Sequence, residues 1–363
     1  MVQLLDRLPS ATEQVVVHAV GTAPTGTRDP LDTMQWHLDH RCGATLTALP
    51  IDTDPRWIID WLDARAEAPG LRQVRAGDSR GYDRVPSYAV EDGHDLEPAS
   101  LALGRPQLVA EAFAARGQLV GDAIPEQLQV SIPNALDLAF FVAGSAEAAP
   151  RWLPAIQTML AGEIREIVQR WGDRVRLQLE SPAVMLKYHQ TPRENWAQLT
   201  DQLVDQAASM IAVAAQADWV LHLVCYGDLE HQPLCVPDGL EAPVVFLNAL
   251  AQRLEAMGIA MPIAHIAVTY GDAAPPTDPA YYEILRELRS DIQVIAGVVA
   301  EHHPEASAVA AALIADAVGK RLKALGPACG LGRRTPEDAA ANLQLSARIA
   351  AFLTTRVRRP AAA

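Results

Sequence analysis

The sequence predicts an α/β protein whose single domain, residues 1–363, is a (β/α)8 barrel of the TIM type. Short runs rich in β-branched residues alternate with longer helical runs almost from end to end. Parallel strands need a crossover long enough to hold a helix, so this alternation favours a parallel sheet. The strand–helix unit recurs eight times, which is the number that closes such a barrel.

The expected elements follow one another in a regular order. Strands are expected at residues 14–19, 44–49, 127–132, 175–179, 220–225, 263–269, 292–299 and 325–329. Helices are expected at residues 31–40, 56–66, 152–171, 193–216, 243–257, 279–289, 305–325 and 336–355. Thr335 supplies a capping hydroxyl before Pro336 at the start of the last helix, and Gly258 ends the helix at 243–257.

Two segments do not follow this pattern. Residues 68–104 are rich in Gly, Asp, Arg and Pro and show little periodicity. We expect an irregular insertion there, after the second strand–helix unit, that covers part of the barrel rim, where long loops tend to carry function. The tail at 359–363 is expected to be frayed.

Composition and charge limit the kinds of binding partner and the cellular compartment that we expect for this protein. The net charge of −14 argues against nucleic acid and against an anionic membrane surface, which leaves a small molecule as the expected partner. The amino terminus lacks a signal pattern, and the sequence contains no apolar run of about 18 residues. Four scattered cysteines favour free thiols or metal ligands in a reducing compartment. We therefore expect a cytoplasmic protein, whose oligomeric state the sequence does not indicate.

Two of the cysteines are placed where predicted strands end. Cys225 ends the fifth strand and Cys329 ends the eighth. Active sites in barrels of this type are built at the carboxyl ends of the strands, so both thiols are expected at one mouth. The glycine-rich turn after Cys329, together with Arg333 and Arg334, is expected to lower the pKa of that thiol.

Several motifs carry a resemblance to a known family. The stretches His222-Leu-Val-Cys-Tyr-Gly-Asp228 and Ala328-Cys-Gly-Leu-Gly-Arg333 resemble the barrel of cobalamin-independent methionine synthase and its uroporphyrinogen-decarboxylase-like relatives. Val20-Gly-Thr-Ala-Pro24 is similar to the opening turn of that superfamily, and Val175-Arg-Leu-Gln-Leu-Glu-Ser-Pro182 to one of its strand ends. The resemblance runs from about the first strand to the last and implies a single-barrel member.

The resemblance implies a metal site and a reaction. In that family zinc is held by a histidine and two cysteines and activates a thiol for alkyl transfer, with a folate or corrinoid as the methyl donor. Two thiolates and one imidazole bind zinc tetrahedrally and leave a position for a substrate thiol. By resemblance the ligands here are His222, Cys225 and Cys329.

The histidine departs from the family pattern. The family spaces its histidine and cysteine two residues apart, whereas His222 and Cys225 are three apart and Leu223 stands at the family's ligand position. Side chains alternate faces along a strand, so we expect His222 and Cys225 to point to opposite sides unless a bulge intervenes or the strand ends early. Alternative fourth ligands nearby are Asp228, Glu180, Glu230 and His231.

Three further residues are candidates for acid–base chemistry. Glu180 ends the fourth strand and is a possible base, ligand or substrate anchor, the alternative being a salt bridge to a rim arginine. His265 in the sixth strand is either catalytic or a hydrogen-bonded core histidine. His302, at the end of the seventh strand, is either a general acid or base or a solvated side chain.

Substrate-binding candidates lie on the same predicted rim. Arg56 is expected to bind a substrate carboxylate and Trp57 to contact its apolar part, unless Trp57 packs a helix on the barrel. Tyr226 and Asp228 follow Cys225 and are candidates for polar contacts with the substrate, as is Arg333. The arginines and tyrosines at residues 80–88 are predicted to form a solvated face.

Three functions remain open from the sequence. The first is alkyl transfer to or from a thiol, with zinc at the cysteine pair. The second is a metal-free lyase or decarboxylase in which Arg56 holds a carboxylate while Glu180 or a histidine transfers protons. The third is a barrel without catalytic activity that serves as a binding protein.

Overall fold

A computed structural model describes residues 14–53 and 56–357, and the tail at 359–363 lies outside them. Its main sheet has eight parallel strands in the spatial order β1-β10-β9-β8-β7-β6-β5-β2. These strands are β1 (Val16–Val17), β2 (Leu49–Pro50), β5 (Leu128–Pro133), β6 (Val175–Glu180), β7 (Asp218–Val224), β8 (Ile263–Ala267), β9 (Val294–Val299) and β10 (Leu322–Pro327).

The sheet closes on itself at its first strand. Val17 on β1 forms a parallel bridge with Leu46, in the segment that leads into β2. The amide of Val17 donates to the carbonyl of Thr45, and the amide of Thr47 donates to the carbonyl of Val17, both at 2.9 Å. Since β1 also pairs with β10, the predicted TIM-type barrel is confirmed.

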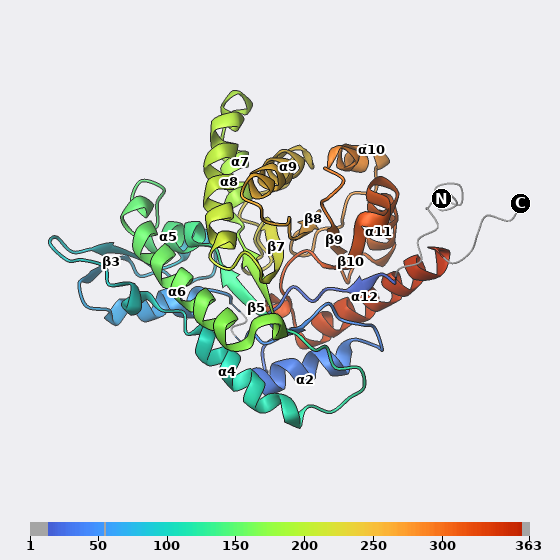
Figure 1. Cartoon of the computed structure of the whole chain (residues 1–363), viewed down its shortest axis with the longest axis horizontal. Coiled ribbons are helices and arrows are strands. Elements are labelled where there is room, and N and C mark those ends of the chain that lie inside the picture. Colours follow the sequence, from blue (N-terminus) through green and yellow to red (C-terminus); the bar gives the residue numbers. More distant parts are fainter. Residues whose placement is uncertain (1–13, 54–55, 358–363) are drawn as a thin grey trace, which may run out of the picture.

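Helices surround the strands on the outside of the barrel (Figure 1). They are α2 (Pro30–His40), α3 (Ile59–Asp63), α4 (Arg105–Ala115), α5 (Ala135–Ala143), α6 (Leu153–Trp171), α7 (Ala183–Gln190), α8 (Trp196–Ala212), α9 (Glu241–Ala256), α10 (Pro279–Glu283), α11 (Pro304–Val318) and α12 (Pro336–Val357). The amide of Asp338 donates to the Thr335 hydroxyl, and Gly258 (φ +70°) follows the end of α9, as predicted. Among the described residues, no helix is both long and apolar enough to cross a bilayer.

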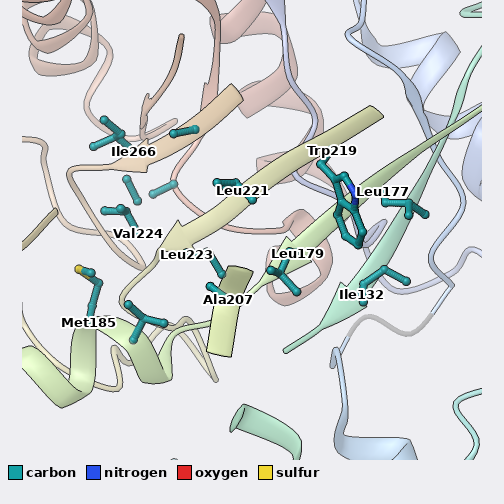
Figure 2. Close-up of a cluster of buried hydrophobic side chains, with 14 of the residues drawn as sticks. Ile132, Leu177, Leu179, Met185, Ala207, Trp219, Leu221, Leu223, Val224 and Ile266 are labelled. Carbon is teal, nitrogen blue, oxygen red and sulfur yellow. The ribbon is translucent and has the colours of Figure 1, made fainter. Parts of the chain in front are cut away.

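The core is divided by the sheet into two layers. Strand faces that point outward pack against the helices, as Leu177, Leu179 and Leu221 do in Figure 2. Inward-facing Val220, Ile295 and Ala324 form a small separate cluster inside the barrel. Both faces of the strands are therefore buried, which explains their nearly continuous apolar sequences.

Some predicted boundaries are wrong. The expected helix at 305–325 is too long because Gly319, with a positive φ of 61°, ends α11 at Val318, and β10 begins at Leu322. Helices α4, α5 and α7 were not predicted. Helix α5 is apolar on nearly all sides because it is buried, so its sequence shows no amphipathic period.

The insertion at 68–104 is more regular than predicted. It contains an antiparallel hairpin of β3 (Leu71–Arg75) and β4 (Ser87–Val90), joined by a loop with a 3-10 turn at Tyr82–Arg84. The hairpin extends beyond the barrel beside α5 and α6 (Figure 1), and β4 packs on α5. Its loop turns back and brings Tyr82 to the carboxyl ends of the strands.

Candidate active site

Two thiols and one imidazole meet at the carboxyl ends of β7 and β10. Cys225 directly follows β7, and Cys329 lies two positions after β10. Their sulfur atoms are 4.0 Å apart although 104 positions separate them in the chain. One ring nitrogen of His222 and the two sulfur atoms all lie within 4.8 Å of one another. The structure therefore brings together the three residues that the family resemblance singled out.

A bulge in β7 overturns the expectation that His222 and Cys225 point to opposite sides. The pairing with β8 shifts between Leu221 and Val224, where three steps along β7 match two steps along β8. Leu223 and Val224 consequently both lie in the outer hydrophobic layer (Figure 2). The extra residue returns Cys225 to the side of His222, as a bulge does in a sheet.

The His222 ring is oriented by a second buried histidine. Nε2 of His265 lies 3.0 Å from the Pro327 carbonyl, which can only accept, so this nitrogen carries a proton. Nδ1 of His265 is then an acceptor, and Nδ1 of His222, 2.8 Å away, donates to it. Nε2 of His222 is left with a free lone pair, buried and without a hydrogen-bond partner among the described residues. Nε2 is therefore free to serve as a ligand atom.

Burial keeps both imidazoles neutral. It lowers the pKa of His265 to about 4, and it lowers the pKa of His222 well below its usual value, with further lowering from His265 and His18. A neutral imidazole is the form that binds a metal ion. His265 is thus a core histidine that positions His222. Of the two roles considered for His265, this is the hydrogen-bonded core residue.

The two thiols differ in acidity. The Cys225 thiol donates toward the Cys329 sulfur, which raises the pKa of Cys225 and lowers that of Cys329. Burial and Asp228 oppose the lowering at Cys329, whereas Arg333 and the Gly330 amide add to it. Cys329 is therefore the more acidic thiol of the pair, and its lowered pKa agrees in direction with the sequence-based expectation.

Glu180 is a buried acid on the wall of the same cavity. Burial raises its pKa, and the nearby Asp52 adds to this shift, although hydrogen bonds from Ser131 and Gln178 oppose it. Nε2 of Gln178 donates to its Oε1 at 2.6 Å. Asp52 itself is paired with the buried Arg105 at 2.8 Å. Glu180 thus lies beside an ion pair without belonging to it, and it remains available to the cavity.

Asp228 also lines the cavity but belongs to a buried ion-pair network. Nη1 of Arg334 lies 3.3 Å from its Oδ2, and Nε of the same arginine lies 2.6 Å from Glu301. All three side chains are at most 3% exposed. Burial nevertheless raises the pKa of Asp228. Arg334 was expected to lower the pKa of Cys329. Its guanidinium instead pairs with the carboxylates of Asp228 and Glu301.

Trp57, Tyr82 and Arg333 also line the cavity. Trp57 and Tyr82 both contact Phe141, at ring-centroid distances of 6.1 Å and 5.9 Å. The Tyr82 oxygen accepts a hydrogen bond from the Asp228 amide at 2.9 Å. The enclosed space is about 40 Å³, whereas one water needs roughly 10–15 Å³.

Three predicted site residues lie elsewhere. Arg56 forms an ion pair with Asp60 and contacts a neighbouring pocket instead of this cavity. Tyr226 faces a separate pocket on the other side of its strand end, because successive side chains alternate. His302 is largely exposed, and its Nε2 is 3.4 Å from Asp338. None of the three lines the cavity between the cysteines.

Tyr82 is the cavity residue that sequence reasoning missed. It was predicted to belong to a solvated face, since its neighbours Arg80 and Arg84 are charged. Burial, and secondly the nearby Cys329, raise the pKa of its phenol well above the usual value, so it stays protonated. The one local signal was Gly227 (φ +78°), where an added Cβ would lie 2.3 Å from the phenol oxygen. The contact joins residues 145 positions apart, so the sequence alone does not reveal why a glycine is needed at this position.

Solved structures with this fold are known. The chain is similar to a B12-independent methionine synthase from Shewanella sp. W3-18-1, solved in complex with selenomethionine, with a TM-score of 0.59 and 11% identity over 94% of this chain and 98% of that chain. It is also similar to a putative vitamin-B12-independent methionine synthase from Listeria monocytogenes, with a TM-score of 0.50 and 13% identity over 96% and 99%. The likeness is one of fold. No protein-family model and no curated protein sequence matches this chain.

Proposed function

We propose that this chain is a methionine-synthase-like alkyl transferase, which moves a methyl group to or from a small thiol at a zinc ion held by His222, Cys225 and Cys329. The observation that carries the proposal is the convergence of two sulfur atoms and one imidazole nitrogen within 4.8 Å of one another at the barrel mouth. Structures of the same fold that are described as methionine synthases support the choice of reaction class.

The geometry fits zinc. Zinc–sulfur bonds of about 2.3 Å at tetrahedral angles place two sulfur ligands about 3.8 Å apart. The sulfur atoms of Cys225 and Cys329 are 4.0 Å apart, well beyond the roughly 2.05 Å of a disulfide. The free lone pair of His222 Nε2 supplies a third ligand atom with its tautomer already set. Three protein ligands leave one tetrahedral position open.

Zinc bound there would lower the pKa of a substrate thiol and so supply a nucleophilic sulfur at neutral pH. In the transfer, a sulfur–carbon bond forms as the bond between the methyl carbon and its donor breaks, and the donor keeps the electron pair. The thiol proton needs an acceptor, and the carboxyl groups that line the cavity are Glu180 and Asp228. Asp228 is paired with Arg334, which leaves Glu180 to hold the proton.

The methyl donor is assigned by resemblance alone, as a folate or a corrinoid. A sulfur-containing amino acid as acceptor or product is supported by the selenomethionine in the Shewanella neighbour. The described cysteines are unpaired. That state suits a reducing compartment, so a cytoplasmic location belongs to the proposal.

A non-catalytic binding barrel is the second candidate. The small size of the cavity, about 40 Å³, favours it, because this volume holds only a few water molecules. The metal-free lyase has less support, since Arg56, its intended carboxylate anchor, is paired with Asp60 outside the cavity.

Metal content and methyl transfer test the proposal together. We expect the purified protein to hold about one zinc per chain by elemental analysis, and Cys225→Ser and Cys329→Ser to lose it. Cys42→Ser is the matched control, because Cys42 is exposed and does not line the cavity. The zinc-loaded protein is then assayed with methyltetrahydrofolate and with methylcobalamin, with homocysteine as the acceptor.

The outcomes separate the candidates. Zinc retained by Cys329→Ser contradicts the ligand assignment. Tightly bound zinc without transfer from either donor favours the binding barrel. Transfer that is indifferent to chelators and to Cys329→Ser refutes a zinc-dependent reaction.

A further inference from the structure

Two buried polar atoms in the loop after β7 have no hydrogen-bond partner among the described residues. They are Oδ1 of Asp228 and Nδ1 of His231. The Asp228 side chain is 1% exposed, and its other oxygen, Oδ2, pairs with Arg334. Oδ1 of Asp228 lies 3.9 Å from Nδ1 of His231, and that nitrogen lies 3.6 Å from Oδ1 of Asp272, in the loop after β8. Both separations are too long for hydrogen bonds, so the two buried atoms are unsatisfied.

The spacing of these atoms suits ligands of one metal ion. Buried polar groups without a partner are rare, and an ion or a water molecule commonly satisfies them. Two metal–ligand bonds of about 2.1 Å at the tetrahedral angle place the ligand atoms about 3.4 Å apart. The separations of 3.6 Å and 3.9 Å around Nδ1 of His231 are close to that value. Asp272 is exposed, so its carboxylate is free to move the small remaining distance.

The charges around these atoms favour a cation. Asp272 also forms a group with Glu301 and His302, in which one ligand atom of each residue lies within 4.8 Å of the others. Burial raises the pKa of Asp228, and the Asp272 carboxylate adds to this shift although Arg334 opposes it. The three carboxylates of Asp228, Asp272 and Glu301, set against the single guanidinium of Arg334, leave two negative charges. One divalent cation balances them.

The loops that carry these residues are held against one another. The His231 carbonyl packs on Gly271, where an added Cβ would lie 2.3 Å from the carbonyl oxygen. Nε2 of His303 donates to the carbonyl of Asp272 at 2.9 Å. Glu230 and His231 form a two-residue turn with positive φ angles of 53° and 60°, where glycine and asparagine are usual. Such strained positions cluster at ligand sites, and here the strain holds the imidazole beside the two carboxylates.

We propose that Asp228, His231 and Asp272 bind a divalent transition-metal ion through two carboxylate oxygens and one imidazole nitrogen, at a site that uses neither Cys225 nor Cys329. Oxygen and nitrogen ligands without sulfur suit manganese or iron better than metals that prefer thiolates. The ion joins the loops after β7 and β8. Since Asp228 also lines the cavity between the cysteines, the ion fixes the position of that carboxylate.

Manganese binding tests the site. The electron paramagnetic resonance signal of free Mn²⁺ weakens when the ion binds a protein, so a titration gives the affinity and the stoichiometry. Excess Mg²⁺ in the buffer occupies weak carboxylate sites on this chain, whose net charge is −14. We expect the native protein to bind about one Mn²⁺ per chain, and Asp228→Asn, His231→Asn and Asp272→Asn each to weaken that binding about tenfold or more. Cys329→Ser is expected to keep the native affinity.

Matched controls remove a similar pair elsewhere on the surface. His189→Asn and Asp238→Asn break a partly exposed histidine–carboxylate pair at 3.0 Å, and both are expected to keep the native affinity for Mn²⁺. Asparagine tolerates a positive φ, so His231→Asn removes the imidazole without adding strain to the turn. Thermal unfolding without metal shows that the variants are folded. Added Mn²⁺ should raise the unfolding temperature of the native protein and of the controls, but not that of the three site variants.

The inference is overturned if the native protein binds no Mn²⁺ in excess Mg²⁺, or if any of the three site variants retains the native affinity. Loss of Mn²⁺ in Cys329→Ser also overturns it, because the ion would then lie at the cysteine pair. Equal weakening in the controls assigns the binding to surface charge and has the same consequence. Failure here is separate from that of the proposed function. Mn²⁺ binding in a protein that holds no zinc leaves this site standing, and zinc at the cysteines without Mn²⁺ binding does the reverse.

Discussion

The orientation of His222 depends on His265, and His265→Phe tests that dependence. The variant removes the acceptor for the Nδ1 proton of His222, which lies 2.8 Å from Nδ1 of His265. A buried donor without an acceptor costs about 1–3 kcal/mol, and His222 avoids that cost only by leaving the tautomer that frees Nε2. We therefore expect zinc affinity to fall about tenfold to a hundredfold, in line with other residues that orient metal ligands.

The affinity is measured by competition for zinc with a chromogenic chelator. His37→Phe is the matched control, because His37 is also buried and donates to one carbonyl, that of Thr33, but lies on α2 away from the cavity. Equal zinc affinity in His265→Phe and the native protein would refute the orientation argument. An equal loss in both variants would assign the effect to general destabilisation.

Two further predictions concern stability. Burial raises the pKa of Asp137 from 3.8 to about 7, so its contribution to the free energy of unfolding is complete below about pH 4 and is lost as the pH rises through about 7. The loss in the free energy of unfolding is at most about 4 kcal/mol. Asp137→Asn should flatten the pH dependence of that free energy, as measured by urea titrations at several pH values. The same pH dependence in the variant and the native protein would contradict this argument. Arg334→Met leaves Asp228 and Glu301 buried without their cation and should cost about 3–5 kcal/mol by the same titration. Arg289→Met, which breaks only exposed pairs, should cost less than about 1 kcal/mol, and similar costs for the two variants would refute the argument.

Elements whose signals are local were predicted well. The strands β5 to β9 and the long helices α6, α8 and α9 were expected within a few residues of where they lie, because burial and periodicity are set by their own sequences. The hairpin of β3 and β4 was missed, since its residues are mostly polar or half-buried and its pairing gives no alternating pattern.

The site was predicted in part, and the failures have separate causes. Cys225 and Cys329 were expected at one mouth because parallel strands present their carboxyl ends together. The bulge that returns His222 to their side arises from pairing between β7 and β8, which strand alternation alone does not reveal. Arg56 was expected to anchor substrate, but Asp60, one helical turn away, pairs with it instead.

The sequence by itself determined the barrel, the order of its strands and the placement of two thiols at strand ends. These properties follow from hydrophobic periodicity and from the rule that parallel strands require crossovers. Tertiary structure decided which side chains share the cavity. The bulge in β7, the buried pairing of His222 with His265 and the approach of Tyr82 each depend on contacts between segments distant in the chain, where one residue of register changes the face that a side chain occupies.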